Sequence, residues 1–305
     1  MDFFVQQLVN GLTLGSVYAL IALGYSLVYG VLKLLNFAHG DVYMVGAFIG
    51  FGVLSLFGGP AALAVPVPVV LLAMFAAAGM GSGLLGVAIE RFAYRPLRDA
   101  PRIAPLITAL GVSFFLQNSV LLLLGAQVRT YDTADFIASS SGIHVGPLDI
   151  SLTRILVIVA AVVLMLVLSR LVAQTKIGKA MRAVAHDREA AEMMGIDINR
   201  TIVVTFFIGS ALAGMAGVMV GLVFSKVFHL MGFVAGLKGF TAAVVGGIGN
   251  VPGAMLGGLL IGLAESFSSG YISSTFENLI VFGILIAVML VRPNGLLGRA
   301  DLQKV

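Results

Sequence analysis

Charged side chains cluster in one short stretch of this chain, residues 176–201, which lies between two apolar runs. Asp187 can accept backbone N–H bonds at the start of a helix, and Glu189 suits the positive end of the helix dipole. Gly195 can adopt the left-handed conformation that ends a helix. The spacing predicts about two turns of polar helix exposed to the cytoplasm. The charged residues of the stretch are Lys176, Lys179, Arg182, Asp187, Arg188, Glu189, Glu192, Asp197 and Arg200.

The string Glu189-Ala190-Ala191, with Gly195 four residues after the second alanine, resembles the EAA-x-x-x-Gly loop of ABC importer permeases. That resemblance implies a docking element for a separate ATPase subunit. An ordinary capped cytoplasmic helix is the alternative, because Glu and Ala are good helix formers in any protein. The Ile-x-Leu-Pro string that follows the usual loop is absent near Thr205, which indicates a divergent branch. The residues predicted to couple to the ATPase are Asp187, Arg188, Glu189, Ala190, Ala191, Glu192 and Gly195, within a loop at 173–200.

A second polar group, Asn36, His39 and Asp41, stands beside long apolar runs. At membrane depth such side chains must bond internally or line a watery path, since unsatisfied polar groups cost several kcal/mol there. We favour a structural role, in which the three cap the ends of a broken helix, over contact with a transported substrate. Metal binding by His39 is not expected, because no second ligand follows at a suitable spacing.

The chain lacks the residues of an ATPase or of an enzyme. Gly178-Lys179 is followed by Ala180 and has no upstream glycine at the distance that a phosphate-binding loop requires. No nucleophile and base stand in a recognisable pattern, so we expect no catalytic activity and no cofactor bound by this chain. Glu265 and Glu277 lie near predicted span ends, where interfacial solvation explains them; proton coupling would require one of them to be buried.

Composition indicates a helical protein with many membrane spans. The 305 residues are 59% hydrophobic and 10% charged, with a mean hydropathy of +1.07. Uncharged runs of roughly 20 residues match the thickness of a bilayer. Cysteine is absent, and the formal net charge of +4 suits membrane orientation better than binding to nucleic acid. The first apolar run lacks a basic n-region and a cleavage site, so we expect a retained span.

The pattern predicts an all-α polytopic fold with about eight membrane-inserted segments. The apolar runs cover residues 3–32, 42–57, 61–89, 103–125, 155–169, 201–225, 239–267 and 272–291. The run at 239–267 contains a cluster of helix breakers and is predicted to be a re-entrant hairpin of two half-length helices. Broken helices at membrane depth border a path or an interface between subunits. The breakers are Gly246, Gly247, Gly249, Asn250, Pro252 and Gly253.

Charge predicts the orientation of the spans. The arginines at 91, 95, 98 and 102 place the loop at 90–102 in the cytoplasm, whereas the polar segment at 126–152 suits the outside. Arg292, Arg299 and Lys304 place the C-terminus in the cytoplasm. Counting crossings from there puts the N-terminus outside, unless one of the first three runs is also broken. Asn199 is the expected cap of the span at 201–225.

Small residues four apart recur along the apolar runs, and we expect them to let helix backbones pack closely. With 38 glycines in the chain, such pairs arise often and indicate packing without a particular function. The pairs are Gly11/Gly15, Gly46/Gly50, Ser210/Gly214, Gly217/Gly221, Gly253/Gly257 and Gly258/Gly262.

Six strings together closely resemble the LivH-type permease subunits of high-affinity branched-chain amino-acid ABC importers. They occupy residues 10–20, 36–41, 90–96, 240–249, 252–254 and 292–298. The resemblance implies a single permease domain over 1–305 in the bacterial cytoplasmic (inner) membrane. It also implies a LivM-type permease partner, two ATPase subunits that hold ATP and Mg²⁺, and an extracytoplasmic protein that delivers Leu, Ile or Val.

Other functions stay open at this point. Permeases for urea, short-chain amides or other amino acids resemble one another more than their substrates do. An ion-coupled secondary transporter also uses broken helices around a midplane site, but it would have no use for the charged stretch at 176–201. A purely structural membrane scaffold would need neither that stretch nor the broken hairpin.

Overall fold

The computed structural model describes residues 2–57, 66–98, 100–101, 103–131, 142–145 and 148–298. The positive residues Arg102, Arg299 and Lys304 lie outside this described part of the chain. The long apolar helices are α1 (Asp2–Leu32), α2 (His39–Phe57), α3 (Val67–Ile89), α4 (Ile103–Leu124), α5 (Leu152–Gln174), α8 (Ile198–Phe224), α9 (Met231–Gly246), α10 (Val251–Tyr271) and α11 (Glu277–Val291).

Short elements join these helices. Charged helices α6 (Lys176–His186) and α7 (Arg188–Met193) follow α5, and a π-turn at Glu90–Tyr94 and a 3-10 turn at Arg95–Leu97 extend α3. A further 3-10 turn, Ser274–Phe276, precedes α11. Strand β1 (Arg129–Thr130) pairs antiparallel with β4 (Lys226–Val227), and β2 (Gly142–Val145) pairs antiparallel with β3 (Leu148–Ser151).

Within the described residues, eight helical segments are long and apolar enough to cross a membrane, and α9 is a shorter apolar helix. The predicted all-α membrane fold is therefore confirmed. Helix α5 is longer than the run at 155–169 and includes Arg154 and Arg170, whose long side chains can carry their charges to the two interfaces.

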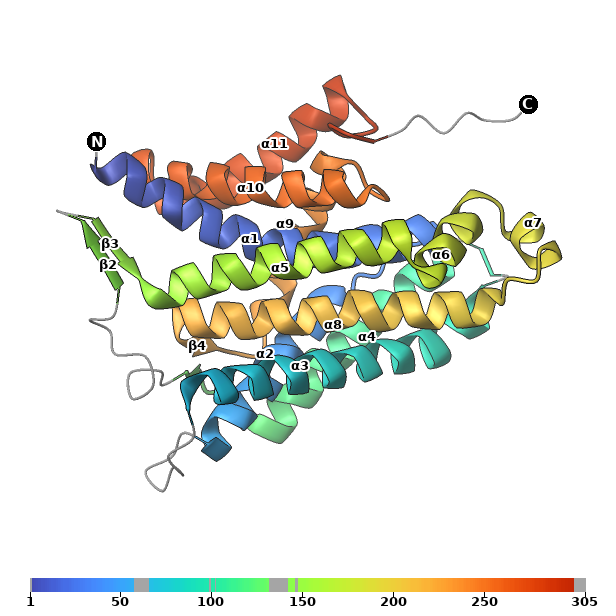
Figure 1. The fold of residues 1–305 in the computed structure, drawn as a ribbon, viewed down its shortest axis with the longest axis horizontal. Helices are drawn as coiled ribbons and strands as arrows, with labels where there is room; N and C mark the ends of the chain where they lie inside the picture. Colours follow the sequence, from blue (N-terminus) through green and yellow to red (C-terminus); the bar gives the residue numbers. More distant parts are fainter. Residues whose placement is uncertain are drawn as a thin grey trace.

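The helices run mainly along the long axis of the molecule (Figure 1). Helices α6 and α7 lie at one end and the N-terminus lies at the other. Arg98, which follows α3, donates a hydrogen bond to Asn199 at the start of α8. The arginine-rich turns after α3 therefore lie at the same end of the molecule as α7. By the positive-inside rule we expect this end to be cytoplasmic and the N-terminus to lie outside, and the placement of α7 and the N-terminus at opposite ends agrees with the count of crossings.

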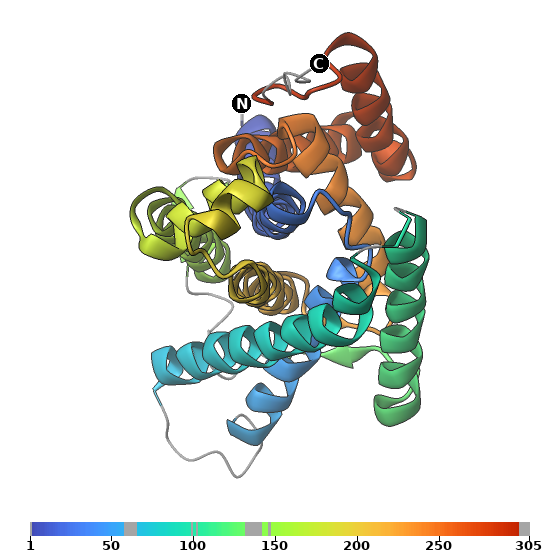
Figure 2. The same ribbon diagram turned by 90° about the vertical axis from the view of Figure 1, so that its right-hand side faces the viewer.

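Helix α1 forms the centre of the bundle. Viewed from the α7 end, α5, α8, α9 and α10 surround it (Figure 2). This position suits a helix that is uncharged on every face from residue 3 to its end and buried along most of its length. A Cβ atom on Gly15 would lie 2.8 Å from the Cα of Leu259 in α10, so only glycine permits this approach.

All six pairs of small residues lie at helix contacts, as expected. A methyl group on Gly46 would overlap the Cα of Gly214, and one on Gly258 would overlap the backbone of Ala19. Helix α2 therefore packs against α8, and α10 against α1, at backbone distance.

The break in the predicted hairpin falls between α9 and α10. Gly247 and Gly249 have φ of +108° and +88°, and the Asn250 side chain accepts a hydrogen bond from the Gly253 amide at 3.2 Å. The expectation of two half-length helices was wrong for α10, whose 21 residues are enough to span a bilayer, whereas α9 with 16 residues is the shorter apolar helix. The apolar run was expected to start at Gly239, which left out Lys238 because of its charge. Lys238 is in fact buried in α9, where it forms an ion pair with Glu265 of α10.

Asp197 caps α8, where Asn199 was expected. The Asp197 Oδ1 atom accepts a hydrogen bond from the Arg200 amide at 2.9 Å, whereas the Asn199 side chain accepts one from Arg98. The stretch at 176–201 also holds one helix more than expected, α6, which Thr175 caps by accepting a bond from the Gly178 amide.

Candidate functional site

Helix α7 forms as its capping residues predicted. The Asp187 Oδ1 atom accepts a hydrogen bond from the Ala190 amide at 3.0 Å, and Gly195 has a φ of +80°. Ala191 is its buried residue, whereas Glu189 and Glu192 face solvent. The flanking Met193 and Met194 are 87% and 82% exposed. A charged surface beside two flexible apolar side chains suits a protein contact.

Arg188 attaches α7 to the transmembrane bundle. Its Nη2 atom donates a hydrogen bond to the backbone oxygen of Leu32, the last residue of α1, at 3.3 Å. Burial, followed by the nearby positive charge of Arg98, lowers the pKa of the Arg188 guanidinium. Arg98 also bonds Glu90 and Asn199. The cytoplasmic ends of α1, α3 and α8 thus meet beside α7.

Helix α6 fixes the other end of the same loop. Met181 and Val184 are buried, and the Arg182 guanidinium donates a hydrogen bond to the backbone oxygen of Val172 in α5. Gly178 lies so close to that backbone that a Cβ atom would overlap it. The charged stretch is therefore a packed pair of helices and not a loose loop.

Asn36, His39 and Asp41 are all buried, but only Asn36 acts as a local cap. Its Oδ1 atom accepts hydrogen bonds from the Ala38 amide at 3.1 Å and from Tyr94 at 3.2 Å. Asp41 instead accepts a bond from Gln117 of α4 at 3.0 Å. His39 packs against Gly24 and the Tyr25 ring. In the part of the chain that is described, no three His, Cys, Asp or Glu side chains could hold a metal.

Glu265 is not solvated at an interface, which corrects the expectation for this residue. It is 6% exposed and accepts hydrogen bonds from Lys238 at 2.9 Å and from Tyr18 at 3.1 Å. Glu277, which keeps partial exposure, lies 3.6 Å from the same lysine. Sequence reasoning missed Lys238, although a lone lysine in an apolar run requires an acid from another helix.

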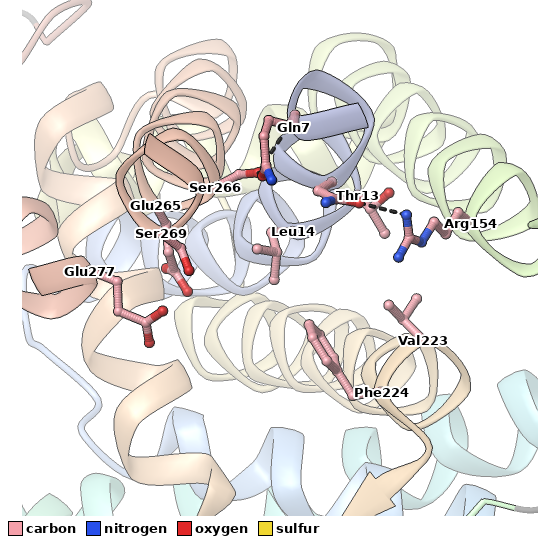
Figure 3. A pocket seen from close by; sticks show the side chains of 12 residues that line it. Gln7, Thr13, Leu14, Arg154, Val223, Phe224, Glu265, Ser266, Ser269 and Glu277 are labelled. Atoms are coloured by element: carbon pink, nitrogen blue, oxygen red, sulfur yellow. Dashed lines mark hydrogen bonds between the residues drawn. The ribbon is translucent and has the colours of Figure 1, made fainter. Parts of the chain in front are cut away.

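A cavity lies beside this ion pair, among α1, α5, α8, α10 and the start of α11 (Figure 3). It occupies about 410 Å³ at the end of the molecule opposite α7. Glu265 and Glu277 lie on one side, Arg154 on the other, and Leu14 between them. Nothing in the sequence pattern signalled this site, because its residues come from distant segments.

Residues 7–290 match the family model described as branched-chain amino acid transport system, permease component. The chain belongs to this permease family. Within it, the chain is 44% identical over 306 residues to BraD of Pseudomonas aeruginosa, a high-affinity branched-chain amino acid transport system permease protein. It is 40% identical over 309 residues to LivH of Escherichia coli K12, which has the same description. Both alignments cover 99% of this chain and 98% of the relative.

This branched-chain amino acid transport permease is also 25% identical to LivM of Escherichia coli K12 over 299 residues, covering 93% of this chain and 68% of LivM. The resemblance expected from the six strings is confirmed. With eight apolar helices of spanning length among the described residues, the permease is a multi-pass protein of the bacterial inner membrane.

Proposed function

We propose that this permease forms the membrane path of an ATP-driven importer for Leu, Ile and Val. The observation that carries the proposal is 40–44% identity, over nearly the full length, to relatives described as high-affinity branched-chain amino acid transport permeases. Identity at this level along the whole chain implies the same spans, loops and packing. The substrate class is therefore carried over from those relatives.

The importer has further subunits in this proposal. A LivM-type permease completes the path, two ATPase subunits bind ATP and Mg²⁺ at the cytoplasmic face, and an extracytoplasmic binding protein delivers the amino acid. The permease itself catalyses no reaction and binds no cofactor. Selectivity comes mainly from the binding protein, so the path needs only transient contacts with a zwitterion.

Helix α7 is the proposed docking element for an ATPase subunit. Its exposed Glu189, Glu192, Met193 and Met194 provide charged and apolar contacts for a groove on that subunit. Movement of the ATPase pair would displace α7 as a rigid body. The bond from Arg188 to Leu32 then passes the displacement to α1, the central helix of the bundle.

The proposal is tested by reconstituting the assembled importer in proteoliposomes. Its binding protein is added, and the buffer is of defined composition. We expect uptake of radiolabelled leucine that requires ATP and stops when the phosphate-loop lysine of the ATPase is replaced. Uptake driven by an ion gradient without ATP would instead indicate a secondary transporter. Identifying the ligand that co-purifies with the binding protein shows whether the importer carries branched-chain amino acids or instead urea or amides.

Docking is tested separately with Glu189→Arg. Charge reversal on the exposed face of α7 is expected to abolish substrate-stimulated ATP hydrolysis and uptake while membrane insertion stays normal. Arg292→Glu, an exposed reversal after α11, is the matched control and should retain both activities. Unchanged activity in Glu189→Arg would remove the case for docking at α7.

A further inference from the structure

The cavity of Figure 3 has a buried floor and an open rim. Thr13 and Glu265 are buried, whereas Phe224 and Ser269 at the rim are exposed. The residues of α1 that line the cavity, Gln7 to Leu14, belong to its N-terminal part, and the N-terminus lies at the end of the molecule opposite α7. A solute released outside the membrane therefore meets this cavity before it reaches the centre of the bundle.

Charges of opposite sign face each other across the cavity. On one side, Lys238 lies between Glu265 at 2.9 Å and Glu277 at 3.6 Å. Two carboxylates beside one ammonium group give this side a net negative charge.

Arg154 supplies the positive charge on the opposite side. Its Nη1 atom donates a hydrogen bond to Asn10 Oδ1 at 2.5 Å, and this bond orients the guanidinium toward the cavity (Figure 3). A guanidinium can bind a carboxylate through two parallel hydrogen bonds.

Glu265 also has an unused hydrogen-bond acceptor. Its Oε1 atom receives both bonds, from Lys238 and Tyr18, while its buried Oε2 atom has no hydrogen-bond partner in the part of the chain that is described. A buried carboxylate oxygen without a donor is costly, so an incoming ammonium group would gain a strong bond there.

An apolar wall completes the cavity. Leu14 of α1 projects between the charged sides, and Val223 and Phe224 of α8 close the lower edge in Figure 3. A volume of about 410 Å³ lies within the usual range for small-molecule sites. The acidic side, the basic side and the apolar wall are the three kinds of surface that the ammonium group, the carboxylate and the side chain of an aliphatic α-amino acid contact.

We propose that this cavity is a binding site for a free α-amino acid with a small branched side chain, on the extracytoplasmic side of the permease. The ammonium group bonds Glu265 and Glu277, and the carboxylate bonds Arg154. The side chain packs on Leu14, Val223 and Phe224. This inference rests on the proposed function and adds the place where substrate binds after leaving its binding protein.

A photoreactive leucine with a diazirine side chain tests the site directly. The assembled importer in lipid nanodiscs is irradiated with this probe, and the labelled residues are mapped by mass spectrometry. We expect labels on Leu14, Val223 or Phe224 that excess leucine removes. Arg154→Gln and Glu277→Gln should each reduce labelling by about tenfold or more, the effect of one lost charge-assisted bond. Arg170→Gln, at the exposed opposite end of α5, should label normally.

Competition by analogues distinguishes binding of the substrate carboxylate by Arg154 from a merely structural role of this residue. Isopentylamine lacks the carboxylate and should compete with the probe at least about tenfold less well than leucine in the unchanged permease. In Arg154→Gln, this disadvantage should disappear. A structural role for Arg154 would lower labelling without changing the ratio between the two competitors.

The site and the proposed function fail in different ways. If the unchanged importer takes up leucine but is labelled elsewhere, or not at all, the cavity is not the site and the function stands. Unchanged labelling in Arg154→Gln and in Glu277→Gln would also contradict amino-acid binding in this cavity. If the unchanged importer takes up no leucine, the proposed function fails.

Discussion

The guanidinium of Arg188 donates a hydrogen bond to the backbone oxygen of Leu32 across 3.3 Å. This bond joins the exposed helix α7 to the end of α1, whose 31 residues extend for about 46 Å. Thr13 and Leu14 of α1 line the cavity at the far end of the bundle. One rigid central helix thus connects the cytoplasmic surface with the proposed amino-acid site.

Arg188→Ala is expected to reduce coupling without preventing assembly. The loss of a bond worth about 1 kcal/mol should lower the leucine transported per ATP hydrolysed by about fivefold. Both rates are measured in the same proteoliposomes. Arg200→Ala, an exposed arginine at the start of α8, should keep the ratio of the unchanged protein. An equal fall in both variants would assign the effect to surface charge and not to the bond with α1.

Gly195→Val and Gly195→Asn test whether the left-handed backbone conformation at the end of α7 matters for ATP-driven uptake. A Cβ atom at this position would have nothing within 4 Å, so only the φ of +80° opposes a side chain. Valine in that conformation costs about 1–2 kcal/mol, whereas asparagine adopts it more readily. We expect ATP-driven uptake to fall in the valine variant and to be largely kept in the asparagine variant. Equal uptake in the two variants would mean that the left-handed turn does not matter for coupling.

Gly46→Val should destabilise the contact between α2 and α8. The new side chain would overlap the backbone of Gly214 and cost about 2–3 kcal/mol, which lowers the melting temperature in detergent. Gly52→Val in the same helix is the control, because a Cβ atom there meets nothing within 4 Å. Its stability should change by no more than about 0.5 kcal/mol. Similar melting temperatures for the two variants would contradict the close approach of α2 and α8.

Asn250 links the break between α9 and α10 to the C-terminal segment. Its Nδ2 atom donates to the backbone oxygen of Leu297 at 2.6 Å, and its Oδ1 atom caps α10. Asn250→Asp keeps the cap but loses the donor, so hydrogen exchange should accelerate at the amides of Leu296 and Leu297. Those amides bond Val245 and Gly246.

Asn250→Ala loses both interactions and should also destabilise the start of α10 by about 1 kcal/mol. Faster exchange should then extend to residues 251–255. Identical exchange patterns in the aspartate and alanine variants would show that the cap and the link to Leu297 cannot be separated.

Local physics determined much of this protein before any contact was known. Hydropathy located the spans, because a bilayer requires roughly 20 apolar residues in each helix. The spacing of Asp187 and Gly195 predicted α7, since a cap and a left-handed glycine act within a few residues. Gly247 and Asn250 marked the break after α9 for the same reason. Family membership was also foreseeable, because six short strings carry it along the whole chain.

The tertiary structure alone decided which charges are buried and which residues form the cavity. Lys238 and Glu265 lie 27 positions apart and Tyr18 and Glu265 lie 247 apart, so no local pattern could pair them. Glu265 was expected in water because burial of a carboxylate is costly unless a partner arrives from another helix. Asp197 displaced Asn199 as the cap of α8 because Arg98, from a distant turn, bonds Asn199. Such choices depend on which helices become neighbours, and packing of the whole bundle determines that.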